Sequence, residues 1–460
     1  MRDRPTRPPV IVIGGGWAGL TAAITLLDHG MPVKLLEAAR QPGGRARTVR
    51  SSDMLIDNGQ HLLIGAYQST LSVMARVGID LEQAFDRSPL SLQMFNGKLS
   101  GLHLKAPRLL PSPWHLLAAF ITAKGLSVTE RFSALRFGHR VLSNTVNTRP
   151  DFSVQALLHS EGQSPGLIRK LWEPLCLATL NTVPGIASAQ LFTVVLQKAF
   201  GSLNRHSDLL IPARELSDLF PRAAVDYLEQ HGGQVELRQR VTGLVTRDSR
   251  VCGVRTGSRQ TDASQVVLAT QHIMARRLIS HHAPLAGLGQ QLGELHDEPV
   301  TTLYLQYPET TRLPMPVVGM VGALSQWVFD RAHCGQAGLM AVVISSSGGH
   351  MKLAAADLTK QVASELATSF PHWPAPLKTR LLREKRATFS SRVGVETLRP
   401  SNRTPVRGLW LAGDYTDTGL PATLESAVVS GLCCAHEMLD HWHPGLPADD
   451  ARRHDRGKLY

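Results

Sequence analysis

The chain has 460 residues, 43% of them hydrophobic and 19% charged, a composition typical of a globular protein with more than one domain and not of a disordered or fibrous chain. Lysine and arginine outnumber aspartate and glutamate by 49 to 37, and the formal net charge of +12 favours anionic partners such as lipid headgroups, phosphorylated ligands or nucleic acids. Five cysteines without metal-ligand spacing argue against a disulfide scaffold or a zinc site and are typical of a reducing cytoplasm.

The first predicted elements form a strand–turn–helix–strand unit. Val10–Ile13 is a fully apolar run, typical of a strand buried on both faces of a parallel sheet. A G-x-G-x-x-G motif follows, then helical spacing over Leu20–Leu27 and a second apolar strand at Val33–Leu36 that ends in Glu37. This order predicts a dinucleotide-binding unit.

Each residue of the motif has a physical reason. Gly14 permits the tight turn, Gly16 lets a pyrophosphate approach the backbone, and Gly19 lets the helix pack closely on the strand. The phosphate then faces the N-terminus of the helix, where free N–H groups favour an anion. Glu37 lies at the spacing at which an acid binds a ribose.

The loop after Glu37, AARQPGGRARTV, adds a second phosphate-binding element. Gly43 and Gly44 allow close approach of the backbone, and Arg45 and Arg47 are charge-assisted donors. A nicotinamide enzyme does not need this loop.

Further along the chain, Ala223–Gly243 predicts a helix, a Gly-Gly turn and a strand, and Val266–Ala269 predicts another buried strand. Near the C-terminus, GLWLAGDYTDTGLPATLESAVVSG predicts a strand at Leu409–Ala412, a turn at Gly413–Asp414 and a helix from Pro421 through Ser430.

The glycine motif, the Arg45 loop and the C-terminal segment together resemble the amine oxidase and phytoene desaturase superfamily of FAD enzymes. The resemblance implies an α/β fold in which a Rossmann-like, glutathione-reductase-like FAD-binding domain is interleaved with an α+β substrate domain. It places the FAD-binding domain at 8–75, 205–280 and 400–440 and the substrate domain at 76–204 and 281–399, with a flexible tail at 444–460. The residues that it implies for FAD binding are Gly14, Gly16, Trp17, Ala18, Gly19, Glu37, Gly43, Gly44, Arg45, Val241, Gly413, Asp414 and Leu424.

Three motifs narrow the resemblance to the hydroxysqualene dehydroxylase family, also called squalene-associated FAD-dependent desaturases. They are DNGQHLLIGAY at Asp57–Tyr67, LWEPLCLATLNT at Leu171–Thr182 with ASAQLF after it, and LPATLESAVVSG. The resemblance implies conversion of hydroxysqualene to squalene in bacterial hopanoid and squalene synthesis. Acid-assisted loss of the allylic hydroxyl would be followed by hydride transfer from N5 of the reduced flavin. No second dinucleotide motif is visible, so the electron donor for the flavin stays unidentified.

The catalytic acid is the least defined part of the predicted site. His61 is the first candidate, because its ordinary pKa of about 6.5 allows protonation near neutral pH, but it is equally well a core histidine or a hydrogen-bond partner of the flavin. Glu173 and Asn181 are second candidates, although their segment also fits a buried helix with one polar edge. Ser426 departs from the superfamily, where glycine is common.

The stretch 101–150 combines seven basic residues and one acid with Trp114 and three phenylalanines, a pattern of helices that contact a membrane surface. The alternative is an amphipathic cap with a solvated basic face. The uncharged run Leu109–Ala123 is too short to span a bilayer. These features predict a cytoplasmic protein, peripheral on the inner face of the cytoplasmic membrane, and no recognition module accompanies the charge to indicate nucleic acid.

Two other functions use the same fold. A carotenoid-type desaturase or amine oxidase would run in the oxidative direction. A prenyl-binding carrier would keep the fold without flavin, against which the retained glycines, Arg45 and Asp414 argue.

Overall fold

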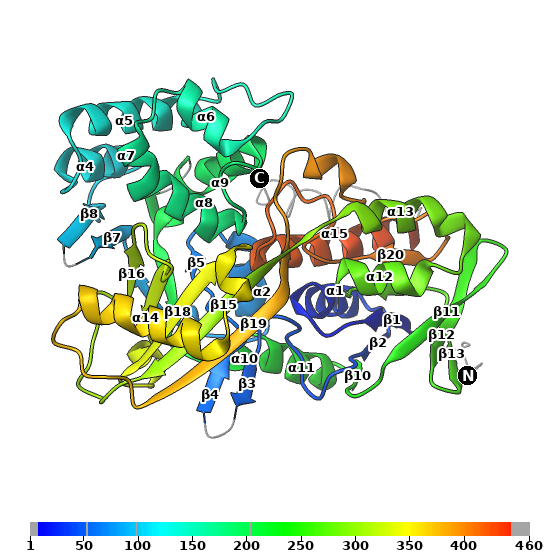
Figure 1. Ribbon diagram of the computed structural model, residues 1–460. Coiled ribbons are helices and arrows are strands. Elements are labelled where there is room, and N and C mark those ends of the chain that lie inside the picture. The colour runs from blue at the N-terminus through cyan, green and yellow to red at the C-terminus, as the bar shows by residue number, and fades with distance from the viewer. Residues whose placement is uncertain (1–7, 52–53, 98, 202–203, 443–460) are drawn as a thin grey trace.

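The computed structural model describes residues 8–51, 54–97, 99–201 and 204–442. The predicted flexible tail at 444–460 lies outside this range. The described chain forms two lobes, one around a parallel sheet and one around a larger mixed sheet (Figure 1).

The first lobe is built on a five-stranded parallel sheet in the order β10-β2-β1-β14-β20. Its strands come from three distant stretches of the chain, as the superfamily resemblance implies, although the exact domain limits stay a prediction. The strands are β1 (Val10–Ile13), β2 (Val33–Leu36), β10 (Gln234–Glu236), β14 (Val266–Leu268) and β20 (Leu409–Leu411).

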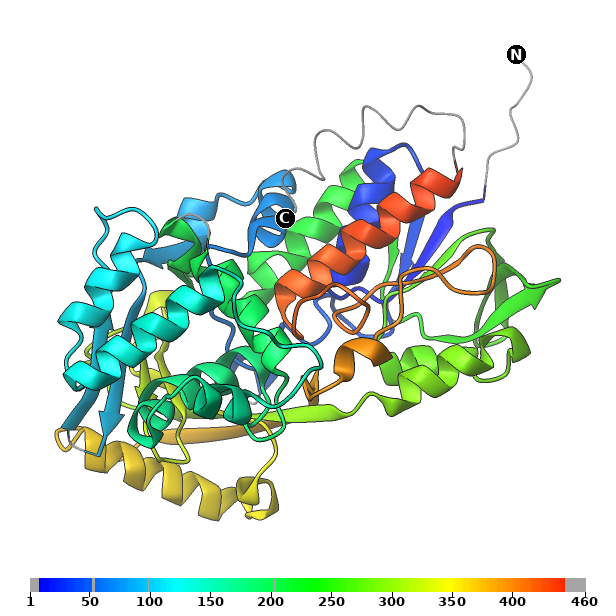
Figure 2. The same cartoon turned by 90° about the horizontal axis from the view of Figure 1, so that it is seen from above.

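Side chains alternate between the two faces of this sheet and are buried on both. Val10 and Val12 pack with the helices on one face, whereas Ile11 and Ile13 pack with the layer on the other. The first face carries α1 (Trp17–Asp28), α11 (Pro221–Gln230) and α15 (Leu424–Trp442), and in Figure 2 α15 runs alongside α1. The second carries β11 (Val241–Arg247), β12 (Arg250–Thr256), β13 (Arg259–Asp262), α12 (His272–Ile279) and α13 (Ala286–Glu294).

The second lobe contains a seven-stranded sheet in the order β19-β15-β18-β17-β16-β7-β8. Val328 and Val342 pack against α14 on one face, whereas their neighbours Trp327 and Val343 face the opposite side. The elements are β7 (Ser91–Asn96), β8 (Leu99–Lys105), β15 (Asp297–Gln306), β16 (Val317–Met320), β17 (Trp327–Asp330), β18 (Leu339–Ser345), α14 (Ala355–Ser369) and β19 (Lys378–Phe389).

A group of helices covers the side of this sheet that α14 leaves open (Figure 1). It comprises α4 (Trp114–Thr122), α5 (Val128–Leu142), α6 (Val154–Ser160), α7 (Pro165–Leu167), α8 (Glu173–Leu180) and α9 (Ala189–Phe200). The remaining short elements connect the lobes: β3 (Thr48–Ser51), β4 (Met54–Asp57), β5 (Leu63–Ile64), α2 (Gln68–Arg76), α3 (Leu81–Ala84), β6 (Phe85–Ser88), β9 (Leu209–Pro212) and α10 (Leu216–Leu219).

The glycine-motif unit has the predicted order, and both of its strands have the predicted bounds. The prediction for the C-terminal helix is wrong in both bounds: the helix begins at Leu424 and not at Pro421, and it continues well beyond Ser430 to Trp442. The predicted start at Pro421 relied on the preference of proline for the first turn of a helix. In the structure Pro421 belongs to the loop that precedes α15. Within the described residues, no helix is both long and apolar enough to cross a membrane.

Candidate active site

A cavity of about 2100 Å³ runs from the carboxyl ends of the parallel strands to the seven-stranded sheet. Sites for one small molecule usually measure about 300–1,000 Å³. The cavity therefore has room for a dinucleotide and for a second large molecule beside it.

The nucleotide end of the cavity is shaped by glycines. Gly14 has a φ of +110°, and a Cβ there would lie 2.5 Å from the carbonyl oxygen of Ala269. Gly16 and Gly44 face each other, and a Cβ on Gly44 would lie 3.1 Å from the Cα of Gly16. Side chains at Gly14 and Gly44 would collide with neighbouring backbone, so these glycines let the two loops approach closely around a cradle that fits the pyrophosphate of FAD. All the predicted FAD-binding residues except Gly19 line the cavity.

Gly19 acts in packing and not as part of the cavity wall. A Cβ at this position would lie 2.0 Å from the carbonyl oxygen of Gly14. Glu37, at the end of β2, accepts hydrogen bonds of 2.6 Å from the backbone N–H groups of Gly15 and Ala39. Its carboxylate thus closes the glycine turn at the place where the predicted ribose contact lies.

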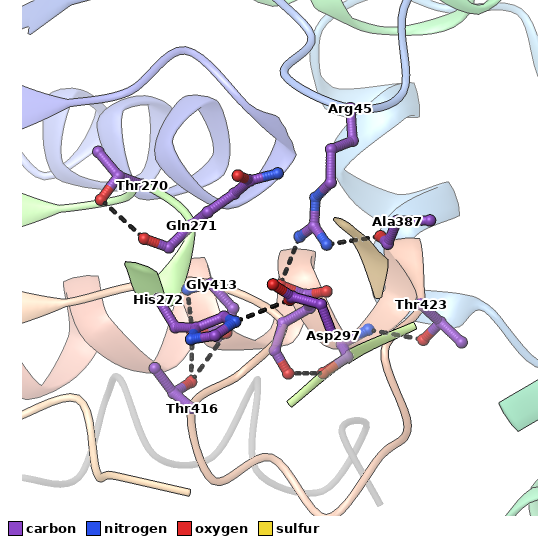
Figure 3. A network of polar contacts seen from close by, with 12 residues as sticks. Arg45, Thr270, Gln271, His272, Asp297, Ala387, Gly413, Thr416 and Thr423 are labelled. Atoms are coloured by element: carbon purple, nitrogen blue, oxygen red, sulfur yellow. Dashed lines mark hydrogen bonds and ion pairs between the residues drawn. The ribbon is translucent and has the colours of Figure 1, made fainter. Parts of the chain in front are cut away.

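Arg45 connects the nucleotide end to both lobes, as Figure 3 shows. Its guanidinium pairs with Asp414 at 2.6 Å and donates to the carbonyl oxygen of Ala387 at 2.7 Å. Burial alone would lower the pKa of Arg45, but Asp414 raises it above its ordinary value. Nearby, His272 and Asp297 form a second pair at 2.8 Å. These contacts fix the guanidinium of Arg45 between the two lobes at the cavity wall.

The C-terminal segment closes the same region. Pro421 and Leu424 line the cavity just before and at the start of α15. Ser426, the departure from the superfamily, is fully buried and is not part of the cavity wall. Its hydroxyl donates to the carbonyl oxygen of Asp414 at 3.1 Å. The extra bulk therefore points into the protein.

Beyond Arg45 the cavity walls are mainly apolar. One wall is the open face of the seven-stranded sheet, and the other is formed by α8 and α9. The residues are Val300, Val317, Trp327, Phe329 and Val343 on the sheet, and Leu175, Leu177, Ala178, Phe192, Val195, Leu196 and Phe200 on the helices.

A group of polar residues, the polar stretch, lies in the cavity wall next to Arg45. It consists of Asn58, Gln60, His61, Glu384 and Thr388. A long hydrocarbon with a single polar group matches this distribution, because burying a polar group is unfavourable unless it is hydrogen-bonded.

A buried network fixes the segment that carries His61. Arg331 pairs with Asp57 at 2.7 Å and donates to the side-chain oxygen of Gln60 at 3.0 Å. The hydroxyl of Tyr304 donates to the carbonyl oxygen of Asp57 and accepts from the amide of Gln60, both at 2.7 Å. Because Arg331 and Tyr304 belong to the second lobe, this segment is positioned from both sides of the cavity.

The three residues predicted as candidates for the catalytic acid lie in different environments. Burial lowers the pKa of His61 to about 4, and Asp57 opposes this effect while Arg45 adds to it, so the imidazole is neutral at neutral pH. Glu173 lies on α8 but not in the cavity wall, whereas Asn181 does line it. Both proposed roles stay predictions. Glu384 is absent from the sequence prediction, because it lies in a strand without a distinctive motif.

Comparison with known proteins agrees with this geometry. The model of the flavin containing amine oxidoreductase family matches residues 17–439. The chain is 26% identical to hydroxysqualene dehydroxylase of Zymomonas mobilis over 94% of this chain and 99% of that protein. The corresponding protein of Rhodopseudomonas palustris is 27% identical over 94% and 98%. A 15-cis-phytoene desaturase of an Oncidium hybrid is 24% identical over 95% and 79%.

Among solved structures, an oxidoreductase from Methanosarcina mazei superposes with a TM-score of 0.72 at 16% identity, over 94% of this chain and all of that one. This likeness concerns the fold.

Proposed function

Because the chain belongs to the flavin containing amine oxidoreductase family, we propose that this FAD-dependent oxidoreductase converts hydroxysqualene to squalene in bacterial squalene and hopanoid biosynthesis. The observation that carries the proposal is the large, mainly apolar cavity with a polar stretch beside Arg45. The hydrocarbon needs no hydrogen-bond partner, and the hydroxyl group finds several there.

The protein's own residues perform three tasks in this reaction. The apolar walls bind the polyene and expel water, which protects an allylic cation from capture. The polar stretch holds the hydroxyl group, which leaves as water once its oxygen is protonated. The Arg45–Asp414 pair and the glycine cradle hold the cofactor, which when bound and reduced supplies hydride. A separate electron donor, still unidentified, must then reduce the flavin again.

An anaerobic experiment tests the reaction. The flavin is reduced with dithionite, hydroxysqualene is added in detergent, and both the absorbance of oxidised flavin and squalene by mass spectrometry are followed. We expect reoxidation matched mole for mole by squalene. Addition of squalene itself is the control, because the product cannot accept hydride. A flavin that stays reduced with hydroxysqualene contradicts the proposal.

The likeness to 15-cis-phytoene desaturase supports a second candidate, a carotenoid-type desaturase with the opposite direction of electron flow. In that case the oxidised flavin should be bleached by a polyene such as phytoene under anaerobic conditions. Bleaching by amines alone would indicate an amine oxidase.

We further propose that the substrate enters from an anionic membrane surface at the α4–α5 surface, defined by Leu109, Trp114, Ile121, Val128 and Phe132. These five side chains are between 53% and 95% exposed. Exposed Lys105, Arg108 and Lys124 lie close to them in the sequence. Exposed apolar groups interleaved with cations suit the interface of a bilayer with anionic lipids.

The α4–α5 surface also adjoins the cavity. Ser112 donates to the carbonyl oxygen of Phe200 at 3.3 Å, and the ring of His115 contacts the hydroxyl of Ser207 at 3.1 Å. Phe200 and Ser207 both line the cavity. We expect the protein to co-sediment with vesicles that contain phosphatidylglycerol, and the double variant Trp114→Ser, Phe132→Ser to stay in the supernatant. Equal sedimentation of both proteins contradicts this part of the proposal.

A further inference from the structure

Strand β19 brings an unexpected carboxyl group to the polar stretch, directly before a bulge. Along β19, Glu384 pairs with Val300 of β15, whereas Thr388 pairs with Glu298, so the register shifts between these pairs. Bulges redirect side chains and are common beside active sites. Here Glu384, Ala387 and Thr388 all line the cavity, and the carbonyl oxygen of Ala387 receives the hydrogen bond from Arg45.

Glu384 is held without being neutralised. One carboxylate oxygen accepts from the amide of Asn58 at 3.4 Å and the other from the backbone N–H of Arg386 at 3.2 Å. Among the residues that the structure describes, Glu384 takes part in none of the ion pairs. The nearby charge of Arg45 is compensated by Asp414 at 2.6 Å.

The other acidic groups of this region are engaged elsewhere. Asp57 pairs with Arg331 and also accepts from the hydroxyl of Thr48 and the backbone of Leu216. Glu425 accepts three hydrogen bonds at the N-terminus of α2. Neither carboxylate is free to give a proton to a molecule in the cavity.

His61 is poorly suited to the role of the acid. Its pKa of about 4 leaves the ring neutral at neutral pH, so it lacks the proton of an imidazolium. Glu384, in contrast, lies in the cavity wall within hydrogen-bond distance of the Asn58 amide, where its carboxyl group faces a molecule bound in the cavity.

On the basis of the proposed function, we propose that Glu384 is the general acid that protonates the departing hydroxyl group. The proton moves from the carboxyl group to the hydroxyl oxygen, the carbon–oxygen bond breaks, and water leaves. Hydride from the reduced flavin forms the new carbon–hydrogen bond, so the substrate gains two electrons and the flavin loses two. The carboxylate, held by Asn58 and the backbone of Arg386, recovers its proton from water once the products have left.

The test compares the wild type with Glu384→Gln, which keeps the shape of the side chain and can still accept from Asn58, but has no acidic proton. Glu309→Gln is the matched control, because Glu309 is exposed and is not part of the cavity wall. Three quantities are measured on each protein: the FAD content, the change of the oxidised-flavin spectrum on titration with squalene, and the anaerobic rate of reoxidation by hydroxysqualene.

We expect Glu384→Gln to keep FAD and the squalene-induced spectral change but to reoxidise at least about 100-fold more slowly, the usual contribution of a general acid. The acetate ester of hydroxysqualene, whose leaving group needs no proton, should restore most of the lost rate. Glu309→Gln should behave like the wild type.

The outcomes separate this inference from the proposed function. A wild-type rate in Glu384→Gln overturns the role of Glu384 alone, and so does a slow variant that the ester does not rescue. A wild-type protein that yields no squalene overturns the proposed function and this inference with it.

Discussion

Replacing Gly16 by alanine should separate cofactor binding from folding. The φ of Gly16 is −77°, which any residue adopts, and the nearest atom to an added Cβ is the Cα of Gly44 at 3.9 Å, an ordinary van der Waals distance. The free energy of unfolding without FAD should therefore stay constant or rise by about 0.4–1 kcal/mol, because alanine restricts the unfolded chain. The same methyl group, however, points into the gap through which the pyrophosphate must approach.

The size of the expected stabilisation by FAD follows from the coupling between ligand binding and folding. A ligand at a hundred times its Kd stabilises the folded protein by about 2.7 kcal/mol. Wild-type protein should show this gain on addition of FAD, whereas Gly16→Ala should lose most of it and Gly16→Val all of it. Thermal unfolding with and without added FAD, together with the FAD content after purification, measures both parts.

Gly19→Ala is the informative contrast. Its Cβ would lie 2.0 Å from the carbonyl oxygen of Gly14 and 2.9 Å from the Cβ of Ala269, so the helix must shift. Overpacking of this kind costs about 1–3 kcal/mol of folding free energy even without cofactor. A Gly16→Val protein that is yellow, with one FAD per chain and a wild-type response to added FAD, would refute the assignment of the cradle.

Three further predictions concern the cavity. Below pH 6.5 the unfolded chain binds a proton at His61 before the folded protein does. The stability that a neutral His61 provides above pH 6.5 is therefore lost as the pH falls towards 4. In denaturant titrations over this range the FAD-free wild type should lose about 3 kcal/mol more free energy of unfolding than His61→Gln, since one pKa unit equals about 1.4 kcal/mol. Equal losses in the two proteins would contradict a neutral buried ring. Arg331→Met should lower the free energy of unfolding by about 3–5 kcal/mol, because it leaves Asp57 buried and unpaired. The double variant with Asp57→Asn should recover part of this loss. A loss below about 1 kcal/mol would contradict the conclusion that this network positions the segment that carries His61. Ala178→Trp should narrow the cavity, raising the KM for hydroxysqualene while leaving the FAD content unchanged, and an unaltered KM would place the substrate elsewhere.

The sequence was most informative where one backbone conformation serves one chemical task. The glycine motif predicted both of its strands and the helix between them, because this glycine spacing between unbroken apolar runs is compatible with few other local structures. The composition of Thr301–Tyr307 and Gln326–Asp330 likewise predicts strands, and these runs overlap β15 and β17, although Tyr307 and Gln326 lie just outside them.

The substrate-binding part of the site could not be predicted from the sequence in this way. Glu384 reaches the cavity because it lies opposite Val300, which also lines the cavity, and this register depends on pairing with β15, which no local pattern reveals. The low pKa of His61 likewise arises from tertiary burial and not from its neighbours in sequence. Glu173 looked equivalent to Asn181 in the sequence, but only Asn181 lines the cavity.

The two faces of the seven-stranded sheet contribute differently to stability and to the shape of the cavity. Val328, Val342 and Ile344 interlock with α14, and a change there lowers stability. Trp327, Phe329 and Val343 lie on the opposite face, where they line the cavity as well as pack in a core, so a change there also reshapes the cavity. Exchanges that conserve volume on this face can alter the cavity while the α14 face keeps the sheet packed, which gives a physical reason why one scaffold can diverge to accept new substrates while its architecture persists at 16% identity.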